Sequence, residues 1–290
     1  MLEPGRQDEQ RATLAEMLRE LRRAAGLSGE RLAARCAMSQ AKISRIETGK
    51  VLASVIDVEQ IVAALAVPDE AAEKLVALAR VANVGYTSWR SLARTGLWRG
   101  QLEIKALHES SRLVRQFLPA IPSGLLQTPD YARQVLTSTM KGRPGRDVDR
   151  MVEARLAWQR VLDDIDRQFK FVLTEQAVRW RRAPLSVMVG QAANLLATAE
   201  RENVDISVVP QTAEVLASPL NIFVVYDERL VTVELFSGTV ALRDPQDVAY
   251  HAELFETFRS RAYRGDEAVE FLRSVADDFR RAGSPAAPGK

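Results

Sequence analysis

The sequence predicts an α+β chain in which an all-helical N-terminal domain precedes a larger mixed domain. Apolar residues recur at three- and four-residue intervals through residues 14–82, which is the helical period. Alternating apolar runs typical of strands begin only after residue 110. At 290 residues, the chain is longer than one small helical domain needs. We expect domains at 1–82 and 101–281, a linker at 83–100 and a disordered tail at 282–290.

Spacing and capping residues predict five helices in the N-terminal domain. Leu14, Leu18, Leu21 and Ala25 form the apolar stripe of the first helix, which Gly26 ends. Ser28 and Ser39 can cap the second and third helices, with a turn at 36–38 between them. Gly49 ends the third helix, and two further helices are expected at 56–65 and 70–82.

The third helix carries the candidate binding surface. Ile43 and Ile46 take its buried face, so the period places polar and small residues outside. Two short helices joined by a tight turn form a helix-turn-helix unit, whose second helix enters the DNA major groove. The alternative is an ordinary helical bundle with a solvated face. The candidate DNA-binding residues are Ser28, Ser39, Gln40, Ala41, Lys42, Ser44, Arg45 and Lys50.

The outer side chains have the chemistry needed to read bases. Gln40 can pair with adenine, Arg45 with guanine, and the Ala41 methyl can contact a thymine methyl. A bidentate pair gives roughly 1–3 kcal/mol of discrimination. Ser39 has two candidate roles, as a helix cap and as a phosphate contact. Lys50 is expected to contact phosphate without selecting a sequence.

Positive charge is concentrated on this segment. Residues 11–50 hold nine Lys or Arg and four Glu, a net charge of +5, whereas the whole chain carries +2. A local positive field favours phosphate binding.

Composition argues against several other classes. No apolar run approaches the ~20 residues of a membrane span, and the N-terminus lacks a signal-peptide pattern, so a soluble cytoplasmic protein is expected. Cys36 is the single cysteine and has the default role of a small buried residue. His108 and His251 lie apart, so no metal site, cofactor or catalytic constellation is expected.

Beyond the N-terminal domain, strands and helices intermingle. Trp89 and Trp98 stand among arginines, where they either pin a linker helix or stack on nucleic acid. A hairpin is expected from two strands separated by residues 227–229. Strands are expected at 112–117, 169–174, 204–209, 222–226 and 230–236, and helices at 103–111, 130–136, 147–162, 185–201, 245–262 and 266–281.

The motif SQAKISRIETGK at 39–50, which follows ERLAARC, resembles the helix-turn-helix of XRE (Cro/C1-type) regulators. The resemblance covers about residues 11–66 and implies a five-helix, lambda-repressor-like domain. It implies that Gln40, Ala41, Ser44 and Arg45 approach bases. The second helix of such domains usually opens with Ser/Thr-Gln, whose Gln contacts the DNA backbone, but here Gly29 follows Ser28. Gly29 also weakens the helix.

The larger domain resembles that of actinobacterial Scr1-type antitoxin-like and WhiJ-like regulators. The resemblance rests on IPSGLLQTPDYARQVL at 121–136, VLTEQAVRW at 172–180 and VDISVVP at 204–210. It implies transcriptional control with partner or signal recognition by this domain, and a small protein from a neighbouring gene as a candidate partner. The segment 124–131 either shapes a binding surface or packs internally. Ser123 departs from the Pro-Gly-Leu-Leu-Gln-Thr pattern usual in the family.

These observations predict a sequence-specific regulator that binds double-stranded DNA and is not an enzyme. A homodimer is expected because one such module binds DNA with modest affinity. The second domain would dimerise or sense a partner protein or ligand of unknown identity. The alternative is an antitoxin-like protein that neutralises a small partner and regulates its own operon.

Overall fold

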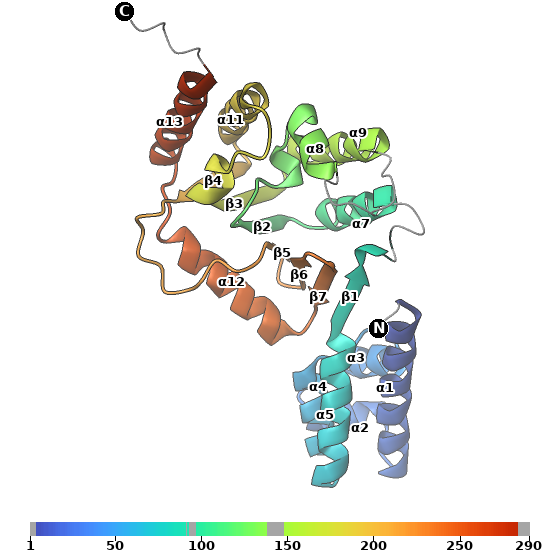
Figure 1. Ribbon diagram of the computed structural model, residues 1–290. Helices are drawn as coiled ribbons and strands as arrows, with labels where there is room; N and C mark the ends of the chain where they lie inside the picture. Colours follow the sequence, from blue (N-terminus) through green and yellow to red (C-terminus); the bar gives the residue numbers. More distant parts are fainter. Residues whose placement is uncertain (1–3, 91, 93–96, 138–147, 284–290) are drawn as a thin grey trace, which may run out of the picture.

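The computed structural model describes residues 4–90, 92, 97–137 and 148–283, which form two lobes (Figure 1). The N-terminal lobe contains five helices within residues 4–83, as the sequence predicts. They are α1 (Pro4–Ala24), α2 (Gly29–Arg35), α3 (Gln40–Glu47), α4 (Val55–Ala64) and α5 (Asp69–Asn83).

The core of the N-terminal lobe is built from the residues that the helical period selects. Leu14 and Leu18 of α1 lie against Ile43 and Ile46 of α3, and each is 1% exposed. Val58 of α4 is fully buried in the same cluster. Burying each such side chain contributes about 1.5–3 kcal/mol, so this packing fixes which face of α3 remains outside.

The C-terminal lobe is built on a mixed seven-stranded sheet, counted within the described residues (Figure 1). The strand order is β1-β7-β6-β5-β2-β3-β4, in which β2, β3 and β4 are parallel and the remaining pairs are antiparallel. The strands are β1 (Val84–Ser88), β2 (Leu113–Leu118), β3 (Gln168–Thr174), β4 (Val204–Val209), β5 (Phe223–Tyr226), β6 (Leu230–Leu235) and β7 (Gly238–Leu242).

Helices cover both faces of this sheet (Figure 1). One face packs against α7, α9, α11 and α13, and the other face packs against α12. The helices are α7 (Leu97–Glu109), α8 (Pro129–Leu136), α9 (Val148–Gln159), α10 (Glu175–Arg179), α11 (Leu185–Ala199), α12 (Pro245–Arg259) and α13 (Asp266–Gly283), with 3-10 turns at Gly124–Leu126 and Arg160–Asp163.

Alternation along the strands explains the two cores. Phe169, Phe171 and Leu173 of β3 enter the core beneath α7, α9, α11 and α13, whereas Val172 enters the core beneath α12. Successive strand side chains point to opposite faces, so a sheet covered on both sides needs apolar residues at nearly every position.

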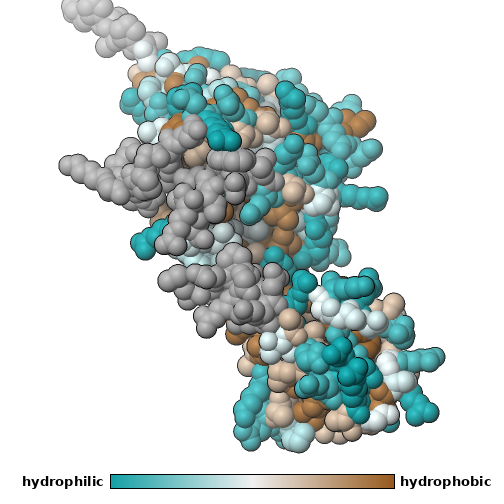
Figure 2. Space-filling view, turned by 90° about the vertical axis from the view of Figure 1, so that its right-hand side faces the viewer, coloured by the Kyte–Doolittle hydropathy of each residue, from teal (hydrophilic) through white to brown (hydrophobic). Residues whose placement is uncertain are grey.

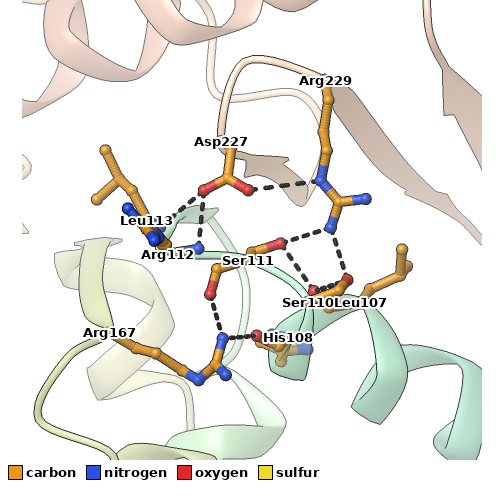
Figure 3. A network of polar contacts seen from close by, with 9 residues as sticks. All are labelled: Leu107, His108, Ser110, Ser111, Arg112, Leu113, Arg167, Asp227 and Arg229. Carbon is orange, nitrogen blue, oxygen red and sulfur yellow. Dashed lines mark hydrogen bonds and ion pairs between the residues drawn. The ribbon is translucent and has the colours of Figure 1, made fainter.

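A polar network ties the β5–β6 turn to the end of α7 (Figure 3). The Asp227 carboxylate accepts the backbone N–H groups of Arg112 and Leu113, both at 2.9 Å. Arg167 donates to the carbonyl of Ser111 at 2.6 Å, and Arg229 donates to the Ser111 hydroxyl at 2.9 Å. The network therefore satisfies polar groups at a helix end and at a strand start.

The two lobes meet without a free linker at residues 84–88. The sequence predicted a linker at 83–100, but α5 runs directly into β1, which pairs antiparallel with β7 at the edge of the sheet. Gly238 of β7 permits this pairing, because a Cβ there would lie 2.2 Å from the Thr87 carbonyl oxygen. The expected pinning role fits Trp89, whose indole N–H donates to the Leu235 carbonyl at 3.2 Å.

The far ends of the predicted elements differ in smaller ways. The disordered tail was expected from residue 282, but Ala282 and Gly283 complete α13, while 284–290 lie outside the described residues. The side chain of Trp98 is also outside them. The predicted helix at 147–162 is α9 followed by a 3-10 turn.

Candidate nucleic-acid interface

The helix-turn-helix unit is held by two serine caps. The Ser28 hydroxyl oxygen accepts the Arg31 N–H, and the Ser39 hydroxyl oxygen accepts the Lys42 N–H, each at 3.2 Å. Ala37 in the turn has a φ of 52°, which is unusual for a residue with a Cβ. The caps satisfy N–H groups that a helix start leaves unpaired, so both helices begin where the sequence predicted.

The outer face of α3 is open. Gln40, Ala41, Ser44 and Arg45 are all exposed, whereas Ile43 and Ile46 hold the helix to its lobe. These four are the residues that the resemblance to XRE regulators implies approach bases. In Figure 2 the lower lobe shows hydrophilic residues interspersed with apolar ones on the side that faces the viewer. No described part of the chain covers these side chains.

The remaining candidate residues flank this face. Ser28 and Ser39 are exposed at the starts of α2 and α3, and Lys50 is exposed just beyond the end of α3. Each serine oxygen accepts a backbone N–H, so its own O–H remains able to donate to a phosphate oxygen. The arrangement places hydrogen-bond donors along the edge of α3, where contacts to the DNA phosphates position a recognition helix.

Lys42 differs from the expectation that it faces outward. Its ammonium lies 2.5 Å from the Asp57 carboxylate of α4, and the Asp57 side chain is 8% exposed. Asp57 also accepts the Ser54 N–H, while the Ser54 hydroxyl accepts the Asp57 N–H, forming a capping box. Lys42 therefore joins α3 to the start of α4, and its ammonium is directed inward because a nearly buried carboxylate needs a partner.

A second ion pair, which the sequence pattern did not predict, braces α3. The Arg22 guanidinium binds both carboxylate oxygens of Glu47, at 2.6 and 2.8 Å, and donates to the Leu27 carbonyl at 2.8 Å. The hydrogen bond to Glu47 raises the pKa of Arg22. The only signal was Glu47 itself, the single acid in an otherwise neutral and basic helix.

The C-terminal lobe holds polar groups in packing roles. His108 is 2% exposed, and burial lowers its pKa to about 4.

Tyr131 is 1% exposed and lies beside an apolar cavity of about 10 Å³, which has room for about one water. The segment 124–131 therefore packs internally at Leu125, Leu126 and Tyr131. Among the described residues, no cluster of His, Cys, Asp or Glu has metal-binding geometry.

Two further features concern the N-terminal lobe and the chain as a whole. Cys36 is buried, as expected, and burial raises the pKa of its thiol. None of the described helices combines the length and the apolar character that crossing a bilayer demands.

The N-terminal lobe matches a known domain family. Residues 13–75 match a family model described as a helix-turn-helix domain. The lobe is therefore a helix-turn-helix DNA-binding domain, in agreement with the caps, the turn and the open face of α3.

The larger lobe places the whole chain in a family. Residues 101–274 match the model described as "Domain of unknown function (DUF5753)", and this match spans more than half of the chain. The chain belongs to the DUF5753 family. No curated protein matches it significantly.

Solved structures resemble the chain only distantly. A phospholipase D family member, Nuc from Salmonella typhimurium, has 10% identity and a TM-score of 0.36, over 63% of this chain and 95% of the other. TrmBL2, an archaeal chromatin protein, has 14% identity and a TM-score of 0.33, over 71% and 66%. NucT from Helicobacter pylori has 7% identity and a TM-score of 0.34, over 63% and 98%. Similarity at this level carries no argument about function.

Proposed function

We propose that this protein is a sequence-specific DNA-binding transcriptional regulator. The observation that supports the proposal is the open outer face of α3, where Gln40, Ala41, Ser44 and Arg45 are exposed on a helix fixed by its buried face. Such a helix can enter the major groove with these side chains against base edges. The proposal includes no catalytic activity for either lobe.

Selection of bound sequences from random DNA tests the proposal. Arg45→Ala should lower the affinity for the selected sequence about tenfold and relax the base preference at one position, because a bidentate contact is lost. Lys50→Ala is the matched control, since it should lower the affinity for all sequences alike and reduce the salt dependence of binding. If the wild-type chain enriches no sequence, or if both variants lose affinity equally on every duplex, the base-reading assignment is wrong.

A homodimer is part of the proposal. One module contacts one half-site, and two modules related by a two-fold axis would contact half-sites about 34–36 Å apart. Sedimentation of the free and DNA-bound chain measures the stoichiometry. Two chains on a palindromic duplex support the dimer, and one chain at saturation contradicts it.

A second candidate is an antitoxin-like interaction protein of the Scr1 or WhiJ type. The observation that favours it is exposed apolar surface on the C-terminal lobe, where Trp180 is 57%, Leu216 90% and Leu220 83% exposed. Large exposed apolar side chains mark interaction sites when they form a patch. Stoichiometric co-purification of one small protein from the native host, lost in Trp180→Ala or Leu216→Ser, supports this candidate.

A further inference from the structure

The junction between the lobes contains a carboxylate shared by two helices. Asp244 is 6% exposed and lies between β7 and α12. One of its oxygens accepts the Gln246 N–H at 2.9 Å, which caps α12 in its own lobe. The other accepts the Val55 N–H at 3.0 Å, at the first residue of α4 in the helix-turn-helix domain. A single side chain thus satisfies helix starts in both lobes.

Three further hydrogen bonds join the same elements near this carboxylate. The Arg243 N–H, one residue earlier, donates to the Asn83 carbonyl at 3.2 Å. The Asn83 side-chain amide is 3% exposed and donates to the Ala53 and Ala79 carbonyls, both at 2.9 Å. Since Ala53 precedes the Ser54 cap of α4, the end of α5, the start of α4 and the start of α12 are bound together.

The α4 start is in turn bonded to the recognition helix. Val55 follows Ser54, which shares a capping box with Asp57, and Asp57 binds the Lys42 ammonium of α3. The hydrogen bonds therefore run from α12 through Asp244, the α4 cap and Lys42 into α3. Each step is a buried or half-buried polar contact, which weakens sharply if a partner shifts.

At its other end, α12 is packed rigidly on the sheet. Phe255 and Phe258 of α12 are 0% and 2% exposed. The Phe258 ring stacks on Phe117 of β2, with centroids 4.0 Å apart. The His251 ring meets Phe223 of β5 edge-on, at 5.3 Å. Closely packed cores shift between discrete arrangements rather than deform continuously, so α12 moves with the sheet as a unit.

We propose that Asp244 is a positioning residue for DNA reading: by capping α4 and α12 with one carboxylate, it makes the orientation of α3 follow the position of α12. This inference rests on the proposed function, because it concerns how the DNA-reading helix is held. A rearrangement of the C-terminal lobe that displaces α12 would break the Asp244–Val55 contact and release the DNA-binding lobe.

Hydrogen exchange on the full-length chain tests the clamp without DNA. Asp244→Ala should raise exchange of the Val55 amide and the start of α4 about tenfold or more, because its acceptor is gone. Asp244→Asn should give an intermediate increase, since an amide has one acceptor oxygen for two N–H groups. Asp227→Ala is the matched control: it also removes a carboxylate with two backbone N–H partners, but only within the C-terminal lobe (Figure 3).

A second substitution perturbs the same junction through the β1–β7 pairing. Gly238→Ala places a methyl group against the β1 backbone and should separate β1 from β7. The expected result is faster exchange at 84–88 and at Val55 together. If Asp244→Ala leaves Val55 exchange at the wild-type rate while the chain stays folded, the clamp is refuted.

The DNA readout separates positioning from general stability. The ratio of affinities for the selected duplex and for an unrelated duplex should fall about fivefold or more in Asp244→Ala and stay at the wild-type value in Asp227→Ala. Nonspecific affinity depends on phosphate contacts and should persist. An unchanged ratio despite faster Val55 exchange overturns the positioning role. A wild-type ratio of one instead overturns the proposed function, while exchange still decides whether Asp244 holds α4.

Discussion

His108 should make the stability of the C-terminal lobe fall as the pH decreases from 6.5 to 4. Its Nδ1–H donates to the Ile104 carbonyl at 2.7 Å, and Nε2 accepts from the Gln116 amide at 3.1 Å, so the ring is neutral. The Trp158 and Tyr226 rings lie 5.1 and 5.3 Å away by centroid. Burial lowers the pKa of His108 from 6.5 to about 4, and the bond to Ile104 opposes this shift.

The magnitude follows from proton linkage. The unfolded chain binds a proton at His108 as pH falls through 6.5, whereas the folded chain binds it only near pH 4. His108 therefore does not reduce the free energy of unfolding above pH 6.5. Its effect lowers the free energy of unfolding as the pH falls from 6.5 to 4. The difference of about 2.5 pKa units, at about 1.36 kcal/mol each, gives a loss of about 3 kcal/mol by pH 4.

Urea unfolding followed by tryptophan fluorescence measures this loss. All four tryptophans lie beyond residue 83, so the signal reports the C-terminal lobe and the junction. His108→Gln removes the titrating ring, and subtracting its pH profile from that of the wild type cancels the carboxylates common to both. If the two profiles run parallel between pH 4 and 6.5, or if NMR shows His108 titrating near 6.5 in the folded chain, the reasoning is refuted.

Three further predictions concern the helix-turn-helix lobe, each measured as hydrogen-exchange stability of its helices. Gly29→Ala should stabilise the lobe by about 1 kcal/mol, because no atom lies within 4 Å of the added methyl group; a loss of stability would contradict this. Ala37→Gly should gain about 0.5–1 kcal/mol by relieving its positive φ, whereas the control Ala34→Gly in α2 should lose about as much. Glu47→Ala should cost about 3 kcal/mol, because the Arg22 guanidinium, whose side chain is 15% exposed, loses its carboxylate partner. Independence from Arg22→Ala in a double-mutant cycle would disprove the brace.

The recognition helix was predictable because its determinants are local. Ser39 and Ile43 are four residues apart, and the cap and the buried face both follow from the period of one helix. The same holds for β3, because the alternation of its polar and apolar residues is contained within seven residues. Each of these features depends on chain geometry within one or two turns, so no knowledge of distant segments is needed.

The edge strand β1 and its neighbour β7 could not be predicted in the same way. Val84–Ser88 and Gly238–Leu242 have five residues each, and each includes a glycine, which weakens strand character. β7 also pairs with β6, the strand just before it, whereas β1 is a strand because it pairs with β7, about 150 positions further along the chain. The predicted linker at 83–100 was therefore wrong at 84–88 for a tertiary reason.

The sequence by itself determined the helices, their caps and the exposed face of α3, since helical period and capping act over three or four residues. Tertiary structure alone decided those ion pairs and caps whose two partners lie on different elements. Lys42 turns inward because Asp57 arrives from another helix, and Asp244 caps α4 across 189 positions of the chain. A charge whose partner lies on another element meets it only when folding brings the two segments within hydrogen-bond distance, and such a pairing leaves no periodic pattern in the sequence.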